Sequence, residues 1–71
     1  MKSDQLRIVA NGEERWVKPP CSIADFLGMY GWKPTQVVVE YNGNVLSRPD
    51  LGKKQLENGD RLEIIVPVAG G

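Results

Sequence analysis

The stretch LRIVANGEERWV, residues 6–17, decides the fold because it is the clearest β-hairpin in the sequence. The residues before Asn11-Gly12 fit the period of two of a half-buried strand, and the residues after it, as far as Lys18, continue as the returning strand. Asn-Gly is the strongest short signal for a two-residue hairpin turn, so it fixes the register and pairs Leu6 with Val17. This register places four apolar side chains on one face: Leu6, Ile8, Ala10 and Val17.

A helix is predicted to follow the hairpin. Pro19-Pro20 ends the returning strand, and Ser22 followed by Asp25 has the spacing of a capping box. Apolar side chains then recur at helical spacing from residue 23, and Gly31 is placed to end the helix. We expect one amphipathic helix that packs a single apolar stripe against the sheet, formed by Ile23, Phe26, Leu27 and Tyr30.

Two further strands are predicted in the middle of the sequence. Residues 36–41 are rich in β-branched side chains, Asn42-Gly43 forms the next turn, and a short strand continues through Val45-Leu46. Residues 47–55 contain arginine, proline and glycine, so we expect an irregular segment there. Two leucines are expected to fill the core beneath that segment, namely Leu51 and Leu56.

The last strand follows a turn at residues 57–60. Its side chains alternate, which directs one set inward and one set outward. The inward set is Leu62, Ile64 and Val66, and the outward set is Arg61, Glu63 and Ile65. Pro67 lacks a backbone donor and biases Val66 toward an extended conformation, so the strand is expected to end there.

The predicted element order is two strands, a helix, two strands, an irregular connection and a final strand. One main helix against one mixed sheet of four to five strands is an α+β roll. Because the last strand is the most apolar, it is expected to lie parallel to the first strand in the centre of the sheet. We expect a folded domain at residues 1–66 and a flexible C-terminal tail at residues 67–71.

Composition excludes several classes of function. The chain has 71 residues, enough for one small domain, and its nine basic and nine acidic residues give a net charge of zero. A nucleic-acid binder would show a basic excess, so we expect no nucleic acid partner. No apolar run approaches the roughly 20 residues of a membrane span, and the N-terminal residues lack the apolar core of a signal peptide. We therefore expect a cytoplasmic protein without a membrane partner.

The sequence offers no catalytic constellation. It has no histidine and a single cysteine, which removes the usual general base and any histidine and cysteine metal cluster. We expect no catalytic residues, no metal and no enzymatic activity of the chain itself. Cys21 is assigned to packing beside the helix start, although a helix N-terminus can also lower the pKa of a thiol and make it reactive.

The chemically specific stretch is the tail, Val68-Ala69-Gly70-Gly71. Two glycines make a thin chain end that fits a channel too narrow for other residues, and five residues beyond the fold reach about 16 Å. The terminal carboxylate is ionised at neutral pH and can attack the α-phosphate of an ATP held by another protein. Chance gives two terminal glycines in only about 0.5% of chains.

The predicted order of elements and this ending resemble the ubiquitin-like β-grasp sulfur carriers, and within them the thiamine-biosynthesis sulfur carrier (ThiS) family. The resemblance covers nearly the whole chain. Its residues are Val9-Ala10-Asn11-Gly12-Glu13, Val39-Glu40-Tyr41-Asn42-Gly43, Arg48, Asn58-Gly59-Asp60-Arg61 and Val68-Ala69-Gly70-Gly71.

The resemblance implies a protein co-substrate rather than an enzyme. A ubiquitin-activating-like adenylyltransferase would adenylate Gly71 with its own ATP, a sulfur donor protein would supply sulfur, and the resulting thiocarboxylate would deliver that sulfur to thiazole synthase. Gly70, Ala69 and Val68 would fit the channel of the partner. The resemblance also implies that the chain binds no cofactor, needs no proteolytic trimming and is a monomer when free.

Several related functions share this ending. The small subunit of molybdopterin synthase also ends in Gly-Gly and often has a proline before its tail, as at Pro67, whereas the short helix favours the thiamine carrier. Carriers for cysteine or other sulfur metabolites are further alternatives. A ubiquitin-like modifier would instead join Gly71 to lysines of target proteins, and a docking domain with an inert tail would not use Gly71 at all.

Four apolar residues are left for the opposite face of the sheet: Val9, Trp16, Val38 and Ile65. Together they could form an exposed apolar patch on the sheet that leads into the tail, and a partner that grips this patch would hold Gly71 near its nucleotide. Ile65 lies six residues before the end and is the expected anchor.

Overall fold

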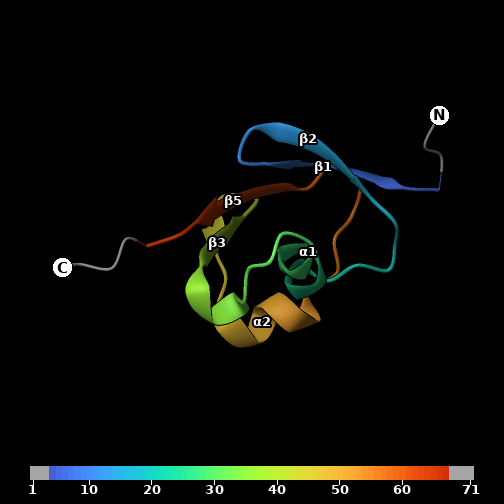
Figure 1. The fold of residues 1–71 in the computed structure, drawn as a ribbon. Coiled ribbons are helices and arrows are strands. Elements are labelled where there is room, and N and C mark those ends of the chain that lie inside the picture. The colour runs from blue at the N-terminus through green and yellow to red at the C-terminus, as the bar shows by residue number, and fades with distance from the viewer. Residues whose placement is uncertain (1–3, 68–71) are drawn as a thin grey trace.

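A five-stranded mixed sheet curves over one side of a seven-residue helix, α1, and a second short helix, α2, packs on another side of α1 (Figure 1). This computed structural model describes residues 4–67. The elements are β1 (Leu6–Ala10), β2 (Glu13–Val17), α1 (Ile23–Met29), the 3-10 turn η1 (Pro34–Gln36), β3 (Val38–Tyr41), β4 (Asn44–Val45), α2 (Arg48–Lys53) and β5 (Arg61–Ile65). None of the described helices has the length and hydropathy needed to cross a membrane.

The strand order β2-β1-β5-β3-β4 places the last strand in the centre of the sheet. β5 runs parallel to β1 and antiparallel to β3, which confirms the predicted α+β roll. The hairpin register is also confirmed, because Leu6 pairs with Val17. Asn11 and Gly12 both adopt positive φ angles, 51° and 79°, as a two-residue hairpin turn requires.

The core lies between the sheet and the two helices. α1 begins with the predicted capping box, in which the Ser22 hydroxyl accepts a hydrogen bond from the Asp25 N–H at 3.0 Å and the Asp25 carboxylate accepts one from the Ser22 N–H at 3.1 Å. The buried apolar side chains come from both layers: Ile8, Ala10, Val17, Cys21, Ile23, Phe26, Leu27, Val37, Val39, Leu51, Leu56, Leu62 and Ile64.

The prediction of an irregular segment at residues 47–55 is wrong, because residues 48–53 form α2. Pro49 lies in the first turn, where its missing N–H has no helical partner to lose. Asp50 in the first turn and Lys53 in the last turn suit the helix dipole. Leu51 and Leu56 are buried, as predicted, so tertiary packing holds this short helix together.

Several predicted element ends shift by one or two residues. Tyr30 is 44% exposed and does not complete the apolar stripe, because α1 ends at Met29. Val66 was expected to point inward, but it follows the last paired residue of β5 and is 51% exposed. β3 begins at residue 38 after η1, β4 covers residues 44–45, and β2 ends at residue 17. Two of the strand ends follow the pairing, because Val17 is paired with Leu6 and Ile65 with Val38, the first residues of β1 and β3.

Candidate functional site

The predicted tail residues Val68, Ala69, Gly70 and Gly71 lie outside the described residues, so the boundary between a domain at 1–66 and a tail at 67–71 stays a prediction. The described chain ends at Pro67, two residues beyond β5. The part of the site that the structure describes is therefore β5, which leads into the tail, together with the sheet face around it.

A buried carboxylate fixes the beginning of β5. Asp60 precedes the strand, and its two carboxylate oxygens accept hydrogen bonds from the Tyr41 hydroxyl at 2.9 Å, the Glu57 N–H at 2.7 Å and the Asn42 Nδ2 at 3.3 Å. Asn42 in turn accepts a hydrogen bond from the N–H of Arg61 at 2.8 Å. These contacts join the start of β5 to the end of β3 and satisfy the buried carboxylate.

A side chain from the first hairpin fixes the other end of β5. Asn11 Oδ1 accepts a hydrogen bond from the Ile64 N–H at 2.7 Å, and Asn11 Nδ2 donates to the Ile64 carbonyl at 3.3 Å. β1 ends at Ala10, so the Asn11 amide takes the place of one more residue of the parallel ladder. The sequence predicted only a turn at Asn11, because a hydrogen bond to a residue 53 positions away leaves no local pattern.

The four predicted docking residues lie on the sheet face opposite α1, but they do not form one patch. Val38 and Ile65 are directly paired and are 38% and 46% exposed. Val9 pairs with Arg61 across β1 and β5 and with Glu14 across β1 and β2. The half-buried Trp16 pairs with Arg7, which forms an ion pair with Glu14. Charged side chains therefore separate Val9 and Trp16 from the Val38–Ile65 pair.

The structure adds to the Val38–Ile65 pair a residue that was not predicted from the sequence. Val45 of β4 pairs with Glu40 of β3, so it lies on the same outer face, and it is 65% exposed. The Asn42-Gly43 turn was the available signal, since a two-residue turn sets Glu40 opposite Val45. We call Val38, Val45 and Ile65 the outer patch.

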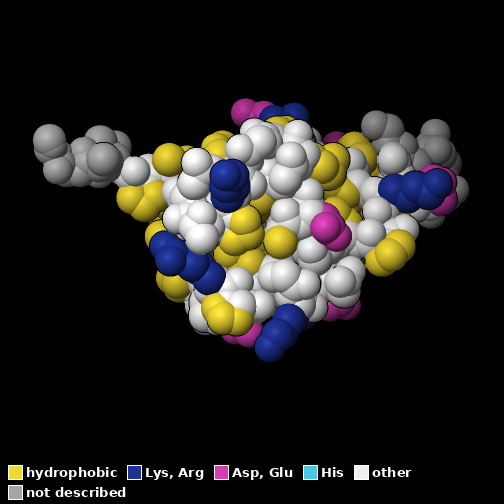
Figure 2. Space-filling model, turned by 60° about the horizontal axis from the view of Figure 1, so that its bottom comes forward, with side chains coloured by type: hydrophobic (Ala, Val, Ile, Leu, Met, Phe, Trp, Pro, Cys, Tyr) yellow, Lys and Arg dark blue, Asp and Glu magenta, His cyan; other side chains and the backbone are white. Residues whose placement is uncertain are grey.

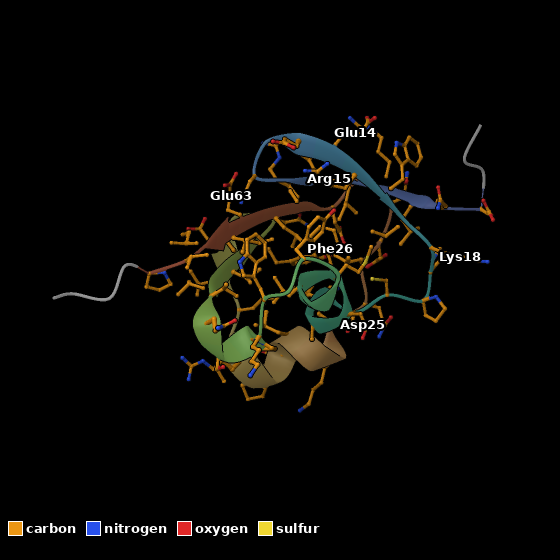
Figure 3. The ribbon with its side chains drawn as sticks, in the orientation of Figure 1. Glu14, Arg15, Lys18, Asp25, Phe26 and Glu63 are labelled. Carbon is orange, nitrogen blue, oxygen red and sulfur yellow. The ribbon has the colours of Figure 1, made fainter. Side chains whose placement is uncertain are left out.

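Two carboxylates lie beside the outer patch. Glu40 and Glu63 are directly opposite each other in the antiparallel pairing of β3 and β5, one step along from the Val38–Ile65 pair. Figure 3 shows Glu63 pointing away from β5 on the side opposite α1, whereas Phe26 points from α1 toward the sheet. The face next to the tail therefore combines exposed apolar and acidic groups.

Two clefts on the described surface differ in size and enclosure. A cleft of about 60 Å³ at the end of α1 is lined in part by Tyr30, Trp32 and Arg15, with the Arg15 guanidinium 5.7 Å from the centre of the Tyr30 ring. Small-molecule sites usually have about 300–1,000 Å³. A larger groove of about 300 Å³ beside α2 is open, and Leu46 is the single apolar residue among the four that line it. Within residues 4–67 no group of three metal-ligating side chains comes together.

Cationic side chains do not gather on the face shown in Figure 2, where lysine and arginine are scattered among polar and apolar groups. This distribution agrees with the net charge of zero. A surface that binds a phosphate backbone would instead concentrate positive charge.

The Cys21 thiol is buried in the core beside the start of α1. Burial raises its pKa above the ordinary value, and the nearby Asp25 carboxylate raises this pKa further. A protonated, enclosed thiol is a poor nucleophile. The structure therefore supports the packing role of Cys21.

The raised pKa of Cys21 predicts a loss of stability in alkali. The unfolded chain releases the thiol proton at a lower pH than the folded chain. The contribution of Cys21 is therefore complete below about pH 8.5 and is lost as the pH rises through the folded-state pKa. Urea unfolding at pH 7 and pH 9.5 should show a smaller alkaline loss in the free energy of unfolding for Cys21→Ala than for the wild type. Equal losses would contradict this assignment.

Comparisons with known proteins agree with the fold. The sequence model of the ThiS family matches residues 4–71. A crystal structure of the thiamine biosynthesis protein ThiS from Geobacter metallireducens is similar with a TM-score of 0.76 and 25% identity, over 93% of this chain and 100% of that one. A solution structure of a thiamine biosynthesis protein from the same organism gives a TM-score of 0.75 and 25% identity, over 93% of this chain and 88% of that one.

Two similar sequences come from longer or uncharacterised proteins. A thiazole synthase from Paramagnetospirillum magneticum is 30% identical over 66 residues, which cover 93% of this chain. This chain spans only 20% of the length of that protein. The uncharacterised protein ycf40 from Trieres chinensis is 28% identical over 61 residues, which cover 86% of this chain and 84% of that protein.

The family match extends over the hairpin, the helix, the central β5 and the diglycine end, and the similar solved structures share the same arrangement of sheet and helix. The expected ubiquitin-like β-grasp roll is thereby confirmed. On the evidence of this match and of the observed fold, the chain belongs to the ThiS family of ubiquitin-like β-grasp sulfur carriers.

Proposed function

We propose that this protein carries sulfur for thiazole formation in thiamine biosynthesis, and that Gly71 is the residue that is adenylated and converted to a thiocarboxylate. The observation that carries the proposal is the ThiS family match, which extends through residue 71. The cytoplasm, where ATP is abundant, is the proposed location. The chain acts as a co-substrate of partner enzymes rather than as a catalyst.

The proposed chemistry uses a single group of this chain. An oxygen of the Gly71 carboxylate attacks the α-phosphorus of ATP on an adenylyltransferase, and pyrophosphate leaves. The outer sulfur of a persulfide on a donor protein then attacks the acyl carbon, and AMP leaves. A thiol next attacks the donor's own sulfur in the resulting acyl disulfide, which releases the Gly71 thiocarboxylate and leaves the donor in a disulfide with that thiol. ATP is proposed to be held by the partner rather than by this domain. Glycine has no side chain, so Gly70 and Gly71 fit a narrow channel.

Thiazole synthase is the proposed acceptor of the sulfur. A protein named thiazole synthase contains a segment that is 30% identical to this chain over 66 residues. A carrier-like segment within that polypeptide supports a working relationship between this fold and thiazole synthase. The sulfur donor protein and the adenylyltransferase are the other proposed partners.

Docking is proposed on the sheet face that leads into the tail. Ile65 and Val38 form the centre of this surface, because they are exposed, directly paired and next to the end of β5. Val9 on β1 and Trp16 on β2 lie on the same face but are separated from this pair by charged side chains. They would contact a partner only at the edge of the interface. Firm contact at β5 would fix the starting point of the tail relative to the nucleotide.

Replacing Gly70 by leucine tests the proposed fit of the tail in the adenylyltransferase. The side chain should displace the Gly71 carboxylate from the α-phosphorus, and a misplacement of about 1 Å can cost roughly 100-fold in rate. Pyrophosphate exchange that depends on this chain should therefore fall by about that factor for Gly70→Leu. The melting temperature should not change, because the last packed element of the described residues, β5, ends at Ile65. Equal exchange rates for Gly70→Leu and the wild type would refute the proposed fit.

A further inference from the structure

On the outer face of the sheet, two acids that form no ion pair among the described residues lie beside three exposed apolar residues. Val38 and Ile65 pair on one side of the Glu40–Glu63 pair, and Val45 lies opposite Glu40 on the neighbouring strand. All three apolar residues are at least 38% exposed. Glu40 is half-buried and Glu63 is exposed. These five residues lie on β3, β4 and β5, and the Val38–Ile65 pair lies at the C-terminal end of β5, which leads into the tail.

The pairing of Glu40 with Glu63 does not help the fold. Like charges directly opposite on an antiparallel pair destabilise it. Arg61 is the outward residue two positions before Glu63, but among the described residues no ion pair joins it to either carboxylate. Neither the Glu40 nor the Glu63 carboxylate forms a hydrogen bond within the described part of the chain. Folding alone therefore leaves these two acids without a stabilising role.

We propose that the Glu40–Glu63 pair receives an arginine or lysine side chain of the partner that activates the tail, while the outer patch contacts apolar side chains around that cation. The inference rests on the proposed function and identifies the chemistry of its docking surface. Two carboxylates with free oxygens suit a guanidinium, which forms parallel hydrogen bonds to carboxylates. Apolar neighbours exclude water and strengthen such a contact.

The position of Glu63 and Ile65 on β5 explains how a contact with the partner there would favour adenylation of Gly71. Glu63 and Ile65 are neighbouring outward residues of β5, and β5 is the strand that continues toward Gly71. Asn11 and Asp60 fix the two ends of β5 to other strands. A partner that binds the outer face therefore binds a rigid strand six residues before the end of the chain, which limits the volume that the tail must search.

The test is the affinity of the full-length chain for the purified adenylyltransferase of the same organism, measured by titration calorimetry at low and high salt. Glu63→Gln and Glu40→Gln should each bind about 5- to 10-fold more weakly at roughly 50 mM salt, and less so at roughly 500 mM salt. The double variant should lose less than the product of the two single effects, because both act on one cation. Glu57→Gln is the control, because it removes an exposed acid in the turn before β5, where the carboxylate lies 3.6 Å from the Lys54 ammonium.

Thermal unfolding of the same variants separates docking from a structural role. Glu63→Gln and Glu40→Gln should melt no lower than the wild type, because each removes a like-charge repulsion. Weaker binding together with unchanged or higher stability is the expected result. Binding by Glu63→Gln and Glu40→Gln that matches Glu57→Gln would overturn the proposal, and the proposed function would stand if Gly71 were still adenylated. If the wild type neither bound nor was adenylated, the proposed function would fail, and this inference would fail with it.

Discussion

Deletion of Gly71 is expected to abolish thiocarboxylate formation without changing the stability of the fold. The described core ends at Ile64, and the residues beyond β5 contribute no buried side chain up to Pro67. Removing the last residue should therefore change the free energy of unfolding by less than about 0.5 kcal/mol. The reaction should nevertheless fail, because the carboxylate would begin one residue short of the ATP α-phosphorus.

This prediction is checked by following adenylation and sulfur transfer for the deletion variant alongside two matched chains. A chain extended by one alanine after Gly71 should also fail, because its carboxylate lies one residue too far. Glu57→Gln should react at the wild-type rate, because residue 57 belongs to neither the tail nor the outer patch. Sulfur transfer by the deletion variant would contradict the assignment of the thiocarboxylate to Gly71.

Replacement of Asp60 by alanine is expected to lower the free energy of unfolding by about 3 kcal/mol, a large part of the stability of so small a domain. The Asp60 carboxylate accepts three hydrogen bonds, from Tyr41, Asn42 and the Glu57 N–H, and the residue is only 6% exposed. Alanine would leave these donors without their partner. The loss would also release the start of β5.

Urea unfolding measures this effect, and two further variants calibrate it. Tyr41→Phe removes one of the three donors and should cost about 1 kcal/mol. Asp50→Ala changes an exposed acid in the first turn of α2 and should cost no more than about 1 kcal/mol. An Asp60→Ala protein as stable as Asp50→Ala would show that the buried carboxylate does not hold β5.

Features set by neighbouring residues could be predicted from the sequence. The hairpin register followed from Asn11-Gly12, and the capping box followed from Ser22 and Asp25. Each of these features depends on residues only a few positions apart in the sequence. The structure of residues 47–55 could not be predicted in this way, because it depends on packing against distant residues. Pro49 and Gly52 suggested an irregular chain, whereas the burial of Leu51 against the core supports α2.

The candidate site was predictable only in part. Alternation along the strands correctly placed Val38 and Ile65 on the outer face, but strand order and register decide which outward residues become neighbours. The contacts that fix β5 join residues distant in sequence, with Asn11 bonded to Ile64 and Tyr41 bonded to Asp60. Such contacts leave no periodic or local signal.

Intact-mass spectrometry tests the carrier role most directly. The chain is incubated with ATP, the purified adenylyltransferase and a sulfur donor protein, and fragmentation then locates any change. The carrier role predicts a product in which one oxygen of the Gly71 carboxylate is replaced by sulfur, formed only when ATP is present. An unchanged mass with partners of demonstrated activity, or a product in which Gly71 is joined to lysines of other proteins, would contradict it.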